Sequence, residues 1–211
     1  MTIRERGFSL VELGMVLVII ALLTGGILLG ARSMIQRGEM ADLVAKVQDL
    51  AAAARQFKGR YGYYPGDLPN AATYLTADGG VSPACSYALG GQIGNGMVDT
   101  TTESDCALEH LQRAGLLTKL DSLGGAYGIS GPGGAPISLW HDAQSHTNAI
   151  RITGLACEMA LELDLKLDAA SAANTPLAAG QVRGLDAAGA PLSTCTTHSA
   201  TDPVATLLIA Y

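Results

Sequence analysis

Residues 8–31 read FSLVELGMVLVIIALLTGGILLGA, and this stretch decides the architecture of the chain. Glu12 is its only charged residue. As a helix the stretch would be about 36 Å long, which is enough to cross a hydrocarbon core of about 30 Å. Residues 1–7 carry Arg4 and Arg6, and this short basic leader predicts that the N-terminus stays cytoplasmic. We therefore expect one transmembrane helix, with the rest of the chain on the far side.

The helix is expected to continue beyond residue 31. Residues 32–58 contain no proline. Their apolar side chains recur at spacings of three and four, namely Leu43, Val47, Leu50, Ala54 and Phe57. Gly59 and Gly62 are typical of a C-terminal stop. These patterns predict a helix over residues 8–58, about 76 Å long, that is apolar all round over 8–31 and amphipathic over 32–58. Residues 59–211 would form a globular head.

The overall composition excludes several protein classes. Apolar residues make up 48% of the 211 residues and charged residues 15%, which excludes an intrinsically disordered chain. The 26 glycines follow no triplet period, so a collagen-like fibre is excluded as well. The formal net charge of −6 argues against a protein that coats nucleic acid, and we predict no nucleic-acid partner.

Glu12 distinguishes between interpretations of the N-terminal segment. A secretory signal peptide would end at a small-residue cleavage site, and GARS at residues 30–33 matches such a site poorly. A carboxylate inside an apolar span costs a few kcal/mol, so it requires a positively charged partner. No Lys or Arg follows Glu12 until Arg32. An α-amino group created by cleavage just before Phe8 would provide that charge.

The motif GFSLVE at residues 7–12 lies between a short basic leader and an apolar helix, and it resembles the class III signal of type IV prepilins and pseudopilins. The resemblance implies that a prepilin peptidase cuts between Gly7 and Phe8 and methylates the new N-terminus at Phe8. It also implies that Glu12 is needed for processing and assembly, because this carboxylate meets the N-terminal amine of a neighbouring subunit in the filament.

Later segments resemble one pilin-like subgroup. They are RQFKGRYGYYPGDLPNA at residues 55–71, EHLQRAGLL at 109–117, LDLKLD at 163–168 and GQVRG at 180–184. The resemblance implies an α+β fold of the type IV pilin kind, in which the C-terminal half of the long helix packs on an antiparallel β-sheet head with long loops. The chain departs from many pilins at Leu29, where they carry a proline.

The head itself shows short segments of regular structure. Strands are predicted by apolar or alternating patterns at residues 137–140, 148–153 and 206–211. Residues 109–119 predict a short amphipathic helix. The pattern of residues 161–168 fits a strand or a helix, and the resemblance favours the helix. The stretches 76–106 and 169–203 are predicted to be loops.

The chain has four cysteines, all beyond the apolar segment: Cys85, Cys106, Cys157 and Cys195. In an oxidising compartment an even number suggests two disulfides, and three pairings are open. We favour Cys85–Cys106 and Cys157–Cys195, because nearer pairs close smaller loops at lower entropic cost. Zinc is the rival interpretation, and the C-x-x-C spacing that it typically uses is missing.

We expect neither an enzymatic activity nor a cofactor, because the sequence contains no familiar catalytic motif. The neighbours His141 and Asp142 would point to opposite faces of a strand, which disfavours a catalytic dyad. The alternative to a head without a cofactor is a head whose loops bind calcium, since two groups of carboxylates lie close in sequence. They are Asp78, Asp99, Glu103 and Asp105, and Asp164, Asp168 and Asp186. Their spacing matches no EF-hand, so we expect these carboxylates to be solvated in the loops rather than bound to calcium.

The resemblance implies a structural subunit, a major or minor pilin, of a type IV pilus-type filament. Its expected partners are the prepilin peptidase, identical or related pilin subunits that contact its N-terminal helix, and an inner-membrane assembly platform. The expected location is the inner membrane, with one span and the head in the periplasm or outside, and then an extracellular or periplasmic filament. The alternatives are a pseudopilin of a type II secretion or DNA-uptake system and a monomeric, membrane-tethered binding or enzymatic domain.

Overall fold

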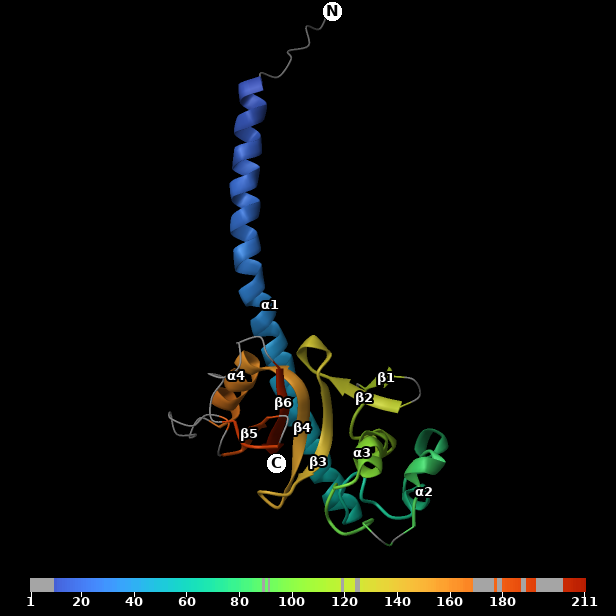
Figure 1. Ribbon diagram of the computed structural model, residues 1–211. Coiled ribbons are helices and arrows are strands. Elements are labelled where there is room, and N and C mark those ends of the chain that lie inside the picture. Colours follow the sequence, from blue (N-terminus) through green and yellow to red (C-terminus); the bar gives the residue numbers. More distant parts are fainter. Residues whose placement is uncertain are drawn as a thin grey trace, which may run out of the picture. The chain divides into compact units, whose positions relative to one another are not determined.

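The computed structural model describes residues 10–88, 90, 92–118, 120–123, 126–168, 177, 180–186, 189–192 and 203–211, with the backbone alone at 26–33, 78, 122, 123, 126 and 203. The architecture is α+β, with a long N-terminal helix and an antiparallel sheet (Figure 1). The α-helices are α1 (Leu10–Tyr61), α2 (Ala71–Tyr74), α3 (Thr101–Arg113) and α4 (Cys157–Leu167). The strands are β1 (Asp121–Leu123), β2 (Ala126–Ser130), β3 (Pro136–Asp142), β4 (Thr147–Ala156), β5 (Val182–Leu185) and β6 (Pro203–Ala210).

Helix α1 ends three residues beyond the expected position 58. Lys58 and Arg60 lie in its last turn, where positive charge is favoured by the helix dipole. Gly62 follows at φ 80°, a left-handed conformation that suits glycine at a helix end. The chain divides into two compact units, residues 1–39 and 40–211, so α1 contributes to both.

The sheet has the strand order β1-β2-β3-β4-β6-β5, and every neighbouring pair is antiparallel. The register sets Leu139 opposite Ile150 and Ile150 opposite Ile209, so one apolar row crosses β3, β4 and β6. Because successive side chains of a strand alternate between faces, this row covers one face of the sheet.

Residues 40–61 of α1 run along that face, and their apolar stripe forms the core with it (Figure 1). All five residues of the predicted stripe are buried: Leu43, Val47, Leu50, Ala54 and Phe57. Met40 extends the stripe toward the N-terminus. Each fully buried Leu or Phe contributes roughly 1.5–3 kcal/mol, so this stripe is a main source of stability for residues 40–211.

The predicted strands at residues 137–140, 148–153 and 206–211 are confirmed as parts of β3, β4 and β6. Helix α4 resolves the ambiguous stretch at 161–168 in favour of a helix. The helix predicted at 109–119 is displaced, because α3 occupies Thr101–Arg113 and begins inside the stretch predicted as a loop. Strand β5 lies inside the other predicted loop, while β1, β2 and α2 had no prediction.

No helix in the described part of the chain combines the length and the apolarity that a membrane crossing requires. The expected inner-membrane location with a single span is therefore wrong for the described chain. A span needs about 20 successive, predominantly apolar residues. The described side chains at the start of α1 cover residues 10–25, with Glu12 among them.

Candidate assembly surface

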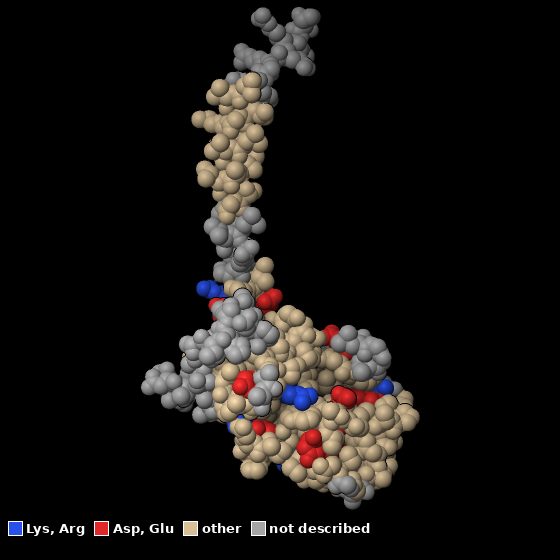
Figure 2. Space-filling model, viewed as in Figure 1, with Lys and Arg blue, Asp and Glu red and all other residues tan. Residues whose placement is uncertain are grey.

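The first part of α1 carries an exposed apolar surface. Its large apolar side chains are each at least 50% exposed; they are Leu10, Val11, Leu13, Met15, Val16, Leu17, Val18, Ile19, Ile20, Leu22 and Leu23. On the side shown in Figure 2, the described surface of this segment is free of charged residues. Exposed apolar patches of this extent mark interaction sites in soluble proteins. We refer to residues 10–25 as the apolar segment.

The apolar segment is apolar on every side of the helix, because residues 10–25 are all exposed and Glu12 is the only charged residue among them. The one hydroxyl, that of Thr24, donates to the carbonyl oxygen of Ile20 at 2.8 Å. This bond satisfies the hydroxyl within the helix itself. A helix with apolar residues all round is typical of helices surrounded by other apolar groups.

Glu12 lies in the first turn of α1. A carboxylate at this position is stabilised by the helix dipole, by roughly 0.3–1 kcal/mol. Glu12 forms no ion pair with another described residue. Gly7 and Phe8, the residues of the expected cleavage site, lie outside the described residues.

The PGD turn that follows α1 is packed against α3. The five residues 65–69 are all buried, although prolines and a glycine would suit an exposed loop. Gly66 has φ 92°, and a Cβ atom there would lie 2.2 Å from the carbonyl oxygen of Glu103. Only glycine permits this close approach of the turn to the backbone of α3.

Asp67 of this turn holds a second loop, residues 94–96, in place by hydrogen bonds. Its carboxylate accepts the backbone N–H groups of Gly94, Asn95 (3.2 Å) and Gly96 (2.8 Å). Burial raises the pKa of Asp67, and these three N–H groups oppose the rise because they stabilise the charged form. Asp67 is fully buried, so its role is to hold the loop rather than to face a ligand.

Helix α3 begins with a capping box. The side chain of Thr100 accepts the Glu103 N–H at 3.2 Å, and Oε2 of Glu103 accepts the Thr100 N–H at 3.0 Å. Burial raises the pKa of Glu103 to about 7, against the lowering effect of the bonds from Thr100. The Thr-x-x-Glu spacing at residues 100–103 is a sequence signal for this helix start that our sequence analysis missed.

His110 connects the turn, α3 and the disulfide loop. Its Nδ1 accepts the Gly66 N–H at 3.0 Å, and its Nε2 lies 3.0 Å from the carbonyl oxygen of Cys85, to which it donates in this tautomer. The ring stacks on Phe57 with the centroids 6.1 Å apart. Burial lowers the pKa of His110, so the imidazole is held neutral. Sequence reasoning gave His110 no role, because its partners lie 25 and 44 residues away.

The expected disulfide between Cys85 and Cys106 is confirmed. It joins α3 to the 3₁₀ turn η2 (Pro83–Cys85). Cys157 at the start of α4 is buried and disulfide-bonded as well, and Cys195 lies outside the described residues. The zinc interpretation is therefore wrong for the three described cysteines, because their sulfur atoms are engaged in disulfides.

The calcium candidates whose side chains the structure describes do not gather into one site. Among the described residues, no group of three or more His, Cys, Asp or Glu side chains is placed to hold a metal ion. Glu103 caps α3, and Asp168 accepts the backbone N–H of Gln181 at 2.6 Å. The side chain of Asp78 lies outside the described residues.

His141 and Asp142 form no dyad. His141 Nδ1 lies 3.3 Å from Oδ1 of Asn148, whereas Asp142 forms an ion pair with Arg183. The two side chains therefore have separate structural partners, on the opposite faces of β3 that the sequence predicts.

The described head thus consists of a sheet and a loop region held together by buried hydrogen bonds and a disulfide. The apolar segment, which lies outside the head, carries most of the large exposed apolar side chains among the described residues. Comparison of the chain with protein-family models, with curated proteins and with solved structures finds no match.

Proposed function

We propose that this chain is a structural subunit of a type IV pilus-type filament and that it assembles through the apolar segment of α1. The observation that carries the proposal is the apolar surface on all sides of residues 10–25, with Glu12 as its single charge. A single flat partner would cover one side of such a helix. Helices of several identical or related subunits would cover all of it, as in a helical bundle.

The energy available to this assembly is large. Burying one Leu, Ile or Val side chain gains roughly 1.5–3 kcal/mol relative to leaving it exposed. Ten or more such side chains of each subunit are exposed in the apolar segment. Burial of ten such side chains is of the size needed to offset the cost of immobilising each subunit, which is on the order of 4–15 kcal/mol.

Glu12 would set the register between subunits. A carboxylate among packed apolar helices is costly unless a positive charge meets it. Cleavage between Gly7 and Phe8 by a prepilin peptidase would create an α-amino group on each subunit, and that group would pair with Glu12 of a neighbour. A subunit shifted along the helix axis would leave both charges buried and unpaired, so only one stagger is stable.

The head fits this role as a compact body on the same helix. The loops that surround α3 are held in place by the disulfide Cys85–Cys106 and by the buried hydrogen bonds of Asp67 and His110. The type IV pilin kind of fold is part of the proposal, with residues 40–61 of α1 as the half that packs on the sheet.

The proposal is tested in two steps on protein isolated from its natural source. Intact-mass and N-terminal peptide mass spectrometry should find a chain that begins at Phe8 with one added methyl group. A chain that begins at Met1 or Thr2 would contradict the assignment.

The second step is filament assembly with charge-reversed variants. Glu12→Lys is expected to abolish filaments seen by electron microscopy, because two positive groups would then meet. Glu39→Lys is the matched control, since Glu39 is an exposed carboxylate of the same helix outside the apolar segment. Normal filaments of the Glu12→Lys variant would refute the register role, and their loss in both variants would show that the effect is not specific to Glu12.

A further inference from the structure

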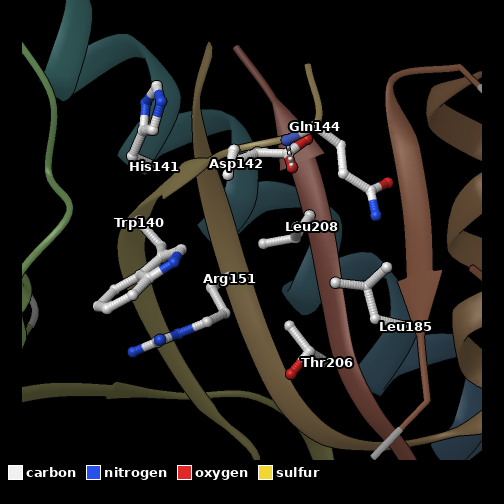
Figure 3. Close-up of a pocket in the computed structure, with 9 residues that line it drawn as sticks. Trp140, His141, Asp142, Gln144, Arg151, Leu185, Thr206 and Leu208 are labelled. Atoms are coloured by element: carbon white, nitrogen blue, oxygen red, sulfur yellow. Dashed lines mark hydrogen bonds between the residues drawn. The ribbon is translucent and has the colours of Figure 1, made fainter. Parts of the chain in front are cut away.

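A hollow of about 310 Å³ lies on the outer face of the sheet, away from α1. On β3 and β4, Leu139 and Ile150 belong to the core with α1, so their neighbours Trp140 and Arg151 point to the opposite face. Figure 3 shows Trp140 and Arg151 at one edge of the hollow, Thr206 and Leu208 in the middle and Leu185 at the other edge. The residues that line it come from the four strands β3, β4, β5 and β6 and from the turn after β3.

One charged pair in this region is internally neutralised. Arg183 reaches from β5 and forms an ion pair with Asp142 at the end of β3. It also donates to Oε1 of Gln144 at 3.1 Å. Asp142 in turn accepts the hydroxyl of Ser145 and the N–H of Gln144. These contacts leave Arg183 and Asp142 with no net charge to offer to a ligand.

Arg151 has a different environment. Its guanidinium carbon lies 4.1 Å from the centroid of the Trp140 ring, and its Nε donates to Oγ of Ser138 at 3.2 Å. These two contacts fix the plane of the guanidinium group without neutralising it. None of the described carboxylates forms an ion pair with Arg151. Burial lowers the pKa of Arg151, and Asp105 on α3 opposes that shift from a longer distance.

The chemistry of the hollow therefore favours an anion with an apolar body. A guanidinium group held in one plane presents parallel N–H donors that match the two oxygens of a carboxylate. Leu185 and Leu208 provide apolar floor, and Thr206 adds a hydroxyl. The charges of Arg183 and Asp142 cancel, so the net charge of the residues that line the hollow is the single positive charge of Arg151. One positive charge matches a monoanion better than a phosphate dianion. The volume lies at the lower end of the range for small-molecule sites.

We propose that this hollow binds a small organic monocarboxylate, with the carboxylate on the guanidinium group of Arg151 and the apolar body over Leu185 and Leu208. This site is separate from the apolar segment and does not depend on the proposed filament role. Filament formation and ligand binding can therefore succeed or fail independently.

The chain contains one tryptophan, Trp140, so its fluorescence reports on this site alone. We would titrate the full chain with cyclohexanecarboxylate and, in parallel, with its neutral amide. The acid is expected to change the Trp140 emission in a saturable manner with a dissociation constant on the order of 1 mM, which corresponds to about −4 kcal/mol. The amide is expected to bind at least about tenfold more weakly, because it lacks the charge that meets Arg151.

Two variants probe the proposed contacts. Arg151→Gln is expected to weaken binding of the acid at least about tenfold, whereas Arg60→Gln, which removes an exposed arginine elsewhere in the chain, should bind as the parent does. Leu185→Glu would place a carboxylate of the protein itself in the hollow and should also abolish binding. This second variant keeps the test decisive if Arg151→Gln does not fold, as judged by circular dichroism.

Three results would overturn the proposal. They are equal binding of acid and amide, binding by Arg151→Gln equal to that of the parent protein, and no saturable response to the acid up to about 100 mM, a hundredfold above the expected dissociation constant.

Discussion

Glu103 offers the sharpest test of how the loop region is held together, because its carboxylate is fully buried at the start of α3. Its folded-state pKa is raised from an ordinary 4.5 to about 7 by burial. One pKa unit corresponds to 1.36 kcal/mol, so ionised Glu103 costs the folded protein about 3 kcal/mol. Replacement by Gln removes this charge and keeps an oxygen that can accept the N–H of Thr100, as a capping box requires.

The sign of the pH effect follows from proton binding. Between pH 4.5 and about 7 the folded protein retains the proton of Glu103, while the unfolded chain loses it. The free energy of unfolding therefore falls as the pH rises through this window, by up to about 3 kcal/mol from this group. His110 acts in the opposite direction, since burial lowers its pKa and acid favours the unfolded chain. The difference between parent and Glu103→Gln removes the contribution of His110, which both proteins share.

The assay is urea unfolding of the full chain from pH 4.5 to 8, followed by Trp140 fluorescence and circular dichroism. At pH 8 we expect Glu103→Gln to be more stable than the parent by about 2–3 kcal/mol, and at pH 4.5 to be equal to it or slightly less stable. Glu158→Gln, which alters an exposed carboxylate on α4, is the matched control and should leave the pH profile unchanged. A constant offset between Glu103→Gln and the parent at every pH would refute the reasoning, because it would show that the carboxylate is not protonated in the folded protein.

Three further predictions concern the stability of the head. Gly66→Ala should lower the free energy of unfolding by urea by about 3 kcal/mol or more, because the new Cβ would lie 2.2 Å from the Glu103 carbonyl oxygen. Gly96→Ala is the control: Gly96 has a similar φ of 86° but open space around it, so the loss should be about 1 kcal/mol. Asp142→Asn should lower the free energy of unfolding by about 3–5 kcal/mol in the same assay, since it breaks a mostly buried ion pair with Arg183. Asp42→Asn, in the exposed ion pair with Lys46, should lower it by less than about 1 kcal/mol. Replacing Cys85 and Cys106 together by Ser should lower the unfolding free energy by about 3 kcal/mol, the value expected for opening a loop of 21 residues; unchanged stability would contradict the constraint on the unfolded chain.

Features encoded over short distances were readable from the sequence. The long helix follows from an unbroken run of helix-compatible residues, and its buried stripe follows from the spacing of residues such as Leu43, Val47 and Leu50. The strands β3, β4 and β6 follow from apolar alternation, and the pairing of Cys85 with Cys106 follows from the small loop that it closes. In each case the signal lies among residues that are neighbours along the chain or about twenty positions apart.

The missed elements lack such local signals. Strands β1 and β5 have three and four residues, too few for an alternating pattern, and they exist because β2 and β6 supply their hydrogen-bond partners. The start of α3 has a local signal in Thr100 and Glu103, but the polar composition of that stretch favoured a loop. The membrane span expected from residues 8–31 was wrong for the described chain, because no described helix combines the required length with the required apolarity.

The sequence by itself determined the α+β class, the long helix, the apolar segment with its single carboxylate, and the disulfide between Cys85 and Cys106, which are close in sequence. Only the tertiary structure decided that His110 joins Gly66 to Cys85, that burial raises the pKa of Glu103, and that Arg151 lies stacked on Trp140 beside a hollow. The physical reason is that helix periodicity and loop closure depend on neighbours along the chain. Burial, charge neutralisation and cavity shape depend on residues that folding brings together from far apart.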